Sequence, residues 1–131
     1  MKINERQGKK RPMNKKQTQS LYSVSQVSKL MNITRKTLYY YDHAGLLAPA
    51  ARLGSLETKY YGEAEIETLK KIKAYRAAGL KISEIQALFH KEKEPMEIFL
   101  QVRKRLENQL TQRKEEIDNL NALMKEAEDK P

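Results

Sequence analysis

The stretch from Ser23 to Leu47 constrains the fold of this chain most strongly, because it encodes two short helices joined by a tight corner. Ser23 and Gln26 match a capping box, in which the serine hydroxyl accepts from a free backbone N–H and the glutamine side chain reaches back. The apolar residues that follow recur at helical spacing and predict one apolar face: Val24, Val27, Leu30 and Met31.

The second helix of this stretch is predicted from Arg35 to about His43. Asn32 marks the corner before it, because asparagine tolerates the left-handed backbone that a helix end requires. Thr34 is a favourable N-cap, and Gly45 is a plausible C-terminal stop. Two short helices with this corner predict a helix-turn-helix.

The second helix also carries the chemistry of a nucleic-acid contact. It opens on Arg35 and Lys36 and continues through three consecutive tyrosines, Tyr39 to Tyr41. Consecutive residues point to different sides of a helix, so we expect Leu38 and Tyr41 to pack inward and Lys36, Tyr39 and Tyr40 to face outward. Two alternatives stay open: Tyr39 and Tyr40 only rim a small core, or the helix-turn-helix contacts no DNA.

The charge distribution favours a polyanionic partner. The chain has 131 residues and a formal charge of +9, but residues 1–90 hold 17 Lys and Arg against 7 Asp and Glu, whereas residues 91–131 hold 9 against 10. The excess of positive charge therefore lies on the helix-turn-helix half, as a DNA-binding surface requires. The alternative is a cationic surface that serves solubility alone.

Residues 1–20 are polar, and seven Lys and Arg face the single acid Glu5. This composition predicts a disordered basic tail. The tail is either an arm that adds phosphate contacts or an extension without a role, in which case Met13 is the true start.

Residues 48–61 predict a β-hairpin beside the helix-turn-helix, because Pro49 and Gly54 interrupt any helix. The turn is expected near Gly54 and Ser55, with a returning strand at Lys59 to Tyr61. Such a hairpin is a wing, from which Arg52, Lys59 and Tyr60 are expected to contact phosphates.

Two further helices follow: Glu63 to Ala78, with Ile66, Leu69 and Ile72 inward, and a shorter one that begins on a second capping box at Ser83.

The final helix is predicted from Pro95 to about Glu128, without an internal Gly or Pro. A lone helix of this length is marginal in water, and its apolar positions form a coiled-coil stripe. No other segment is long enough to cover the stripe, so the predicted partner is a second copy of the chain; the alternative is a helix that folds back on its own domain. The predicted dimerisation residues are Phe99, Val102, Leu106, Leu110, Ile117, Leu120 and Met124.

Three motifs together resemble the N-terminal domain of MerR-family bacterial transcription regulators: residues 21–27, residues 34–42 (TRKTLYYYD) and Gly45-Leu46-Leu47. The likeness extends to about Phe89. It implies a winged helix-turn-helix, a homodimer through an antiparallel coiled coil, and binding to promoter DNA. It also implies that the dimer distorts an overlong promoter spacer so that RNA polymerase can use the promoter. RNA polymerase is then an indirect partner.

The chain departs from this family pattern in several places. Tyr39 stands where the family usually has arginine, and Gln26, Asn32 and Thr58 replace an acid, a glycine and an aromatic residue. The sequence contains no cysteine, which excludes disulfides and thiolate metal sites, and we expect no metal or redox sensor of the thiol kind. We also expect no drug-binding domain, and the effector is unknown.

No catalytic or metal-binding motif is present: the two histidines are far apart, and there is no glycine-rich phosphate loop or nucleophile with a base at motif spacing. We therefore expect no enzyme and no cofactor. The sequence has neither a signal peptide nor a membrane-spanning segment, which predicts a cytoplasmic, nucleoid-associated protein of bacterial type.

The resulting prediction is an all-α winged helix-turn-helix with a small β-hairpin wing and a long C-terminal coiled-coil helix. Its parts are a basic tail (1–20), a DNA-binding domain (21–90) and a dimerisation helix (95–128). Two rival functions remain, a DNA-architectural or chromosome-organising protein and a coiled-coil adaptor with a basic surface. The expected DNA-binding residues are Tyr22, Thr34, Arg35, Lys36, Thr37, Tyr39, Tyr40, Arg52, Lys59 and Tyr60.

Overall fold

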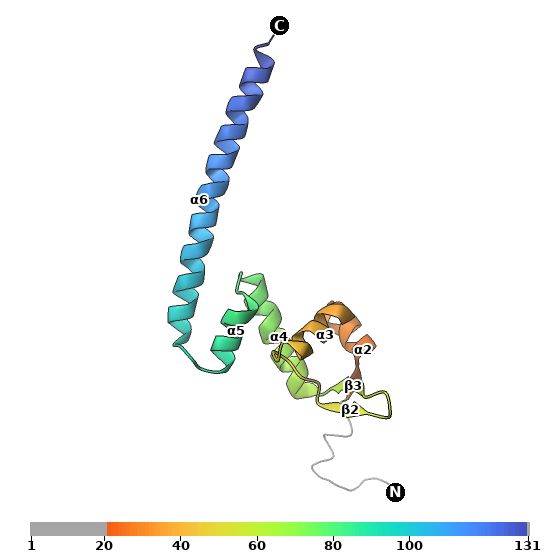
Figure 1. The fold of residues 1–131 in the computed structure, drawn as a ribbon. Coiled ribbons are helices and arrows are strands. Elements are labelled where there is room, and N and C mark those ends of the chain that lie inside the picture. The colour runs from red at the N-terminus through yellow and green to blue at the C-terminus, as the bar shows by residue number, and fades with distance from the viewer. Residues whose placement is uncertain (1–20, 131) are drawn as a thin grey trace, which may run out of the picture. The chain divides into compact units, whose positions relative to one another are not determined.

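A computed structural model describes residues 21–130, and the prediction of a disordered tail at 1–20 lies outside them (Figure 1). The described residues fall into two compact units, divided between Ala77 and Ala78. The elements, in order, are β1 (Tyr22–Ser23), α2 (Val24–Met31), α3 (Arg35–His43), β2 (Ala51–Leu53), β3 (Thr58–Tyr61), α4 (Glu63–Ala77), α5 (Ile82–Phe89) and α6 (Pro95–Glu128).

The helix-turn-helix forms as its capping residues predict. The Ser23 hydroxyl accepts from the Gln26 N–H at 3.2 Å, and the Gln26 side chain accepts from the Ser23 N–H at 2.8 Å. Asn32 is left-handed, with φ 52°, and turns the chain out of α2. The Thr34 hydroxyl then accepts from the Thr37 N–H at 3.0 Å and starts α3. Local capping therefore determines both helix starts and the corner between them.

The prediction of an apolar face on α2 is wrong at one residue, Leu30. Val24 and Val27 are buried, but Leu30 is 60% exposed. The helix has only two turns, and the core reaches one narrow stripe of it.

The wing is part of a three-stranded antiparallel sheet rather than a two-stranded hairpin, with strand order β1-β3-β2. Tyr22 pairs with Tyr61 and Ser23 with Tyr60, while Arg52 pairs with Lys59. The all-α prediction is thus correct for the bulk of the chain and omits β1. A strand of two residues has no side-chain periodicity, because only its backbone pairing defines it.

Helix α4 and the helix-turn-helix share one core in the first unit. Tyr61 is fully buried there, and burial raises the pKa of its hydroxyl to about 12. The other buried apolar residues of this unit are Val24, Val27, Leu38, Tyr41, Leu46, Leu47, Ile66, Leu69 and Ile72.

In the second unit, α5 packs against the beginning of α6, and the buried residues on these helices are Ile85, Ile98 and Val102. Helix α5 begins at Ile82, one residue before the predicted cap at Ser83. Glu84 sets this start, because its carboxylate accepts from the Lys81 N–H at 2.7 Å. The predicted capping box, from Ser83 to Gln86, is therefore wrong by two residues, because Glu84 and Lys81 occupy these roles instead.

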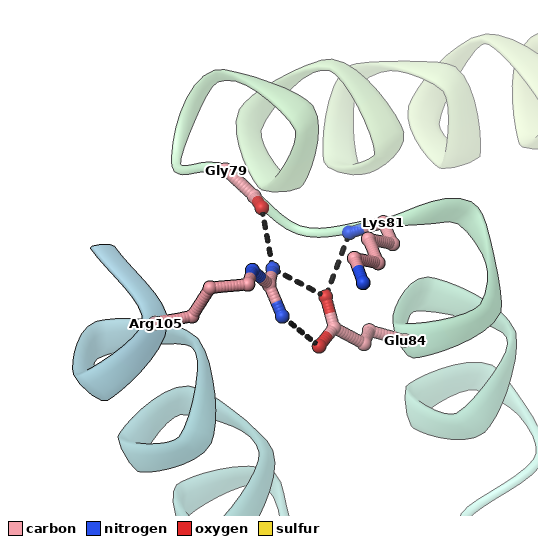
Figure 2. Close-up of polar contacts among 4 residues, drawn as sticks. All are labelled: Gly79, Lys81, Glu84 and Arg105. Carbon is pink, nitrogen blue, oxygen red and sulfur yellow. Dashed lines mark hydrogen bonds and ion pairs between the residues drawn. The ribbon is translucent and has the colours of Figure 1, made fainter. Parts of the chain in front are cut away.

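Arg105 of α6 binds the corner that leads into α5 (Figure 2). Its guanidinium donates to both oxygens of Glu84, at 2.7 and 2.9 Å, and to the Gly79 carbonyl at 2.9 Å. Hydrogen bonds from Arg105 lower the pKa of Glu84 and raise the pKa of Arg105. A bidentate pair of this kind fixes direction as well as distance, so it sets the angle at which α6 leaves α5.

Gly79 is expected to resist substitution, because its φ is +93° and an added Cβ would lie 3.3 Å from both methyl groups of Leu106. Gly79→Ala should lower the free energy of unfolding by about 1–2 kcal/mol from the left-handed backbone alone, with a further loss from the contact. Urea unfolding followed by far-UV circular dichroism measures this. Gly54→Ala is the matched control, since Gly54 has φ +79° and open space around it. Equal losses in the two variants would remove the Leu106 contact from this account.

Candidate nucleic-acid interface

One face of α3 is exposed, and it carries the residues expected to meet DNA. Leu38 and Tyr41 are buried, whereas Tyr39 and Tyr40 are 44% and 52% exposed. Lys36 is also exposed, and within residues 21–130 no hydrogen bond or ion pair occupies its ammonium. Lys36 and Tyr40 are therefore available to a ligand that approaches this face.

The N-terminal end of α3 is held from both sides. Thr34 and Thr37 bond each other through their hydroxyls at 2.8 Å, and the Arg35 guanidinium donates to the Ser25 hydroxyl of α2. Arg35 thus lies along the corner of the helix-turn-helix with part of its donor capacity used. Its remaining N–H groups can still donate to a phosphate.

Asp42 joins α3 to β2 and β3, the two strands of the wing. The Arg52 guanidinium donates to its two carboxylate oxygens at 2.8 and 3.0 Å, and the Lys59 ammonium lies 3.4 Å away. The hydrogen bonds from Arg52 hold the pKa of Asp42 below its usual value. Arg52 is predicted to contact phosphate, and its guanidinium uses two of its five N–H groups on Asp42, which positions the wing.

Lys59 has a second neighbour in α3. Its ammonium lies 4.4 Å from the centre of the Tyr39 ring, which is cation–π distance. Tyr39, at the position where arginine is usual in the resembled family, therefore supports a cation from the wing instead of supplying one.

These side chains surround an open cleft of about 370 Å³ between the helix-turn-helix and the wing. Its polar lining comes from both, and includes Ser23, Ser25, Arg35, Thr58 and Lys59. The structure thus brings Arg35, Tyr39 and Lys59 together around one depression.

Two other residues that are predicted to contact DNA, Tyr22 and Tyr60, interact with other parts of the first unit. The Tyr22 hydroxyl donates to Glu63 at 2.8 Å, and this bond raises the pKa of Tyr22. Tyr60 is half-buried in β3, between Ser23 and Ala51 of the neighbouring strands. Neither residue lies on the exposed face of α3.

Sequence reasoning missed Asp42, Ser25 and Glu63 as the residues that hold this surface. One signal was available for Asp42, since it is the only acid between Glu5 and Glu57 in a basic stretch. A lone carboxylate among cations is a natural ion-pair centre. No comparable pattern marks Ser25 or Glu63, whose partners are distant in sequence.

The predicted dimerisation residues divide into two groups. Val102 is 3% exposed and lies in the core of the second unit. The other six are between 37% and 59% exposed along α6: Phe99, Leu106, Leu110, Ile117, Leu120 and Met124.

The family model described as "MerR HTH family regulatory protein" matches residues 22–92, which is more than half of the chain. The chain belongs to this family.

Among curated relatives, the transcriptional activator TipA of Streptomyces coelicolor is 37% identical over 67 residues, which cover 51% of this chain and 26% of TipA. The multidrug-efflux transporter 1 regulator of Bacillus subtilis is 31% identical over 105 residues, or 80% of this chain and 36% of that protein. The chain therefore spans about a quarter to just over a third of these MerR-family relatives.

Solved structures of the family have the same winged helix-turn-helix fold. The N-terminal part of the B. subtilis multidrug transporter activator, MtaN, matches with a TM-score of 0.67 and 25% identity, covering 79% of this chain and 97% of MtaN. EcmrR, in a cryo-EM structure of its DNA complex, matches with a TM-score of 0.76 and 24% identity, covering 82% of this chain and 40% of EcmrR. The second likeness concerns the fold alone.

No helix in residues 21–130 is long and apolar enough to cross a membrane. Within the same residues, no group of three or more His, Cys, Asp or Glu side chains is placed to hold a metal ion.

Asp42→Asn tests whether the carboxylate holds the wing. The amide keeps the size of the side chain and loses its charge, so we expect the free energy of unfolding to fall by about 1–2 kcal/mol at pH 7. Thermal or urea unfolding measures the change. Asp118→Asn, at an exposed position of α6, is the control and should have little effect.

The pH dependence of this difference follows from the lowered pKa of Asp42. A carboxyl with a depressed folded pKa stabilises the fold above its unfolded pKa, and the stabilisation is lost as the pH falls through the folded value. The gap between wild type and Asp42→Asn should stay constant from pH 7 to about pH 5 and shrink below about pH 4. A gap that is unchanged at pH 3 would contradict the role of the Asp42 charge.

Proposed function

We propose that this chain is a sequence-specific transcriptional regulator that binds promoter DNA as a homodimer. The observation that carries the proposal is the exposed face of α3, with Lys36 and Tyr40 unoccupied, next to a wing that Asp42 holds in place. A helix with exposed cations and hydrogen-bonding side chains, beside a fixed wing, suits a major groove and its flanking phosphates.

In this proposal each copy places α3 in a major groove and the wing on the adjacent backbone. Lys36 and Arg35 neutralise phosphates, Thr34 and Thr37 line the helix start, and Tyr40 reaches backbone or base edges. Lys59, supported by Tyr39, adds a phosphate contact at the cleft. Arg52, Tyr22 and Tyr60 have mainly a positioning role, because their polar groups or rings are engaged within the first unit.

The relatives support the choice of partner. TipA carries the name of a transcriptional activator, and the relative from Bacillus subtilis carries the name of a regulator of multidrug-efflux transporter 1. For this chain we propose the mode of action that the family resemblance implies: two inverted half-sites, with a distorted spacer between them. Distortion costs several kcal/mol and depends on the bases in the spacer, so it adds specificity without base contacts. RNA polymerase is then affected indirectly, through the shape of the promoter.

Residues 21–90 form the DNA-binding domain of this proposal, and residues 95–128 the dimerisation helix. Among the predicted dimerisation residues, the six exposed ones would meet the second copy, and Val102 supports α6 from within the chain. The proposed role is regulatory rather than enzymatic, needs no cofactor, and is carried out on the nucleoid in the cytoplasm.

Selection of bound sites from a random duplex library at near-physiological salt tests the function directly. A dimeric regulator should enrich an inverted repeat with fixed spacing between its half-sites. Binding without enrichment would favour the DNA-architectural reading, and no binding at all would favour a coiled-coil adaptor. Either result would overturn the promoter proposal.

Lys36→Ala tests the contribution of the exposed cation on α3. Loss of one phosphate contact should weaken binding to all sequences alike and reduce the slope of log K against log salt by about one. Titrations at several salt concentrations measure both quantities. Lys130→Ala, beyond the end of α6, is the matched control and should leave the slope unchanged. An unchanged slope in Lys36→Ala would remove this residue from the contacts.

A further inference from the structure

The tip of the wing carries two exposed leucines. Leu56 is 88% exposed and Leu53 is 49% exposed, and Leu56 has the largest exposed fraction among the large apolar side chains of residues 21–130. Single exposed leucines are common on protein surfaces and need no explanation by themselves. The place of Leu56 in the fold, rather than its exposure alone, indicates what it contacts.

The turn that carries Leu56 has a defined backbone. It runs from Gly54 to Glu57, between Leu53 and Thr58, which pair across the two strands of the wing. The Glu57 N–H donates to the Gly54 carbonyl at 3.1 Å, and φ is positive at both residues, 79° and 53°. The closed turn holds Leu56 at its outer side, so a contact made there loses little conformational entropy.

Leu56 also lines the open cleft between the wing and the helix-turn-helix. The same lining contains the cations Arg35 and Lys59 and the apolar side chain of Val24. A DNA backbone offers a partner for each kind of side chain, because charged phosphates alternate with deoxyribose, whose surface is mostly carbon and hydrogen. A strand whose phosphate lies near Arg35 and Lys59 therefore brings a deoxyribose toward Leu56.

The charge around the tip favours DNA over a protein surface as the partner of Leu56. Residues 21–77, the described part of the first unit, hold 9 Lys and Arg against 5 Asp and Glu. The cleft lining holds two cations against one acid, Glu57. An apolar protein surface placed on Leu56 would cover these cations without supplying counter-charge, which is costly. A nucleic-acid backbone supplies the counter-charge and the apolar sugar together.

We propose that Leu56 packs against deoxyribose at the minor-groove edge of the strand whose phosphate faces the cleft. The proposal rests on the proposed function and adds an apolar contact to its charged ones. With α3 in the major groove, the wing lies over the strand that bounds this groove, and its tip reaches the minor-groove side of the sugars, where apolar side chains can contact DNA. Apolar burial there releases no counterions, so it strengthens binding without changing its salt dependence.

Leu56→Ser tests the contact in the whole chain with a random-sequence duplex, since deoxyribose is present at every site. Affinity should fall about tenfold, because the side chain loses most of its apolar area. The slope of log K against log salt should stay unchanged, in contrast to the loss of about one expected of Lys36→Ala. Fluorescence anisotropy titrations at several salt concentrations measure both quantities. Unchanged affinity, or a change of slope as large as that of Lys36→Ala, would overturn the proposal.

A structural role for Leu56 predicts a different result. Because the side chain is 88% exposed, Leu56→Ser should leave the urea midpoint of unfolding unchanged while DNA affinity falls. Leu53→Ser is the matched control, since Leu53 follows Arg52 in β2 and points to the opposite face of the sheet from the cations that bind Asp42. It should change DNA affinity by less than about twofold. Equal losses of affinity in the two variants would overturn the assignment to Leu56.

Two other substitutions at position 56 separate the apolar contact from the shape of the turn. Leu56→Met keeps an apolar side chain of similar area and should bind within about twofold of wild type. Leu56→Lys places an ammonium beside the backbone and should steepen the salt slope by about one. A loss in Leu56→Met as large as that in Leu56→Ser, or an unchanged slope in Leu56→Lys, would place residue 56 away from the DNA backbone.

Leu56→Cys locates the contact on the DNA, because the natural sequence has no cysteine. Iron–EDTA attached to this thiol releases hydroxyl radicals, which cleave the nearest deoxyribose residues. On the duplex that the selection enriches, the cuts on the two strands should be staggered toward their 3′ ends, as radicals released in the minor groove produce. A stagger toward the 5′ ends, or no cleavage by a protein that remains bound, would overturn the proposal.

Failure of this inference is distinguishable from failure of the proposed function. A chain that enriches an inverted repeat, but binds DNA equally well as wild type and as Leu56→Ser, would lose only the Leu56 contact. A chain that binds no duplex in any titration would overturn the proposed regulator together with this contact.

Discussion

The position of the wing relative to α3 depends on one carboxylate. Asp42 lies near the end of α3 and is 11% exposed, with Arg52 of β2 and Lys59 of β3 as its partners. A largely buried carboxylate between two cations is destabilised when either cation is removed, because its charge is then poorly compensated. The same three residues therefore fix the distance between the exposed face of α3 and the wing, which is the distance that a groove and its flanking phosphates would have to match.

This arrangement divides the cations of the first unit into two kinds. Arg52 and Lys73 are committed inside the fold, the first to Asp42 and the second to the Met31 carbonyl at the end of α2. Lys36 remains exposed without a partner among the described residues, and Lys59 is shared between Asp42, Tyr39 and the open cleft. A count of basic residues thus overstates the proposed DNA contact, and the salt slope of binding should reflect the exposed cations only.

The sequence predicted those elements whose causes are local. Caps at Ser23 and Thr34, the left-handed Asn32 and the unbroken helix from Pro95 follow from residues within one or two turns of each other. The two-residue strand β1, the exposure of Leu30 and the engagement of Arg52 and Tyr22 depend on segments 10 to 41 residues away. Spacing along the chain cannot supply such contacts. For the same reason the candidate site was recognised by its exposed residues, while the acids and hydroxyls that hold them were missed.

Arg105 shows how one polar contact can orient the start of a long helix. Its guanidinium donates to both oxygens of Glu84 and to the Gly79 carbonyl, and a bidentate pair fixes direction as well as distance. Burial holds only the first part of α6, through Ile98 and Val102, whereas every residue from Leu106 to the end of the helix is exposed. The direction in which this exposed part leaves α5 therefore depends on the contacts of Arg105 rather than on a core of its own.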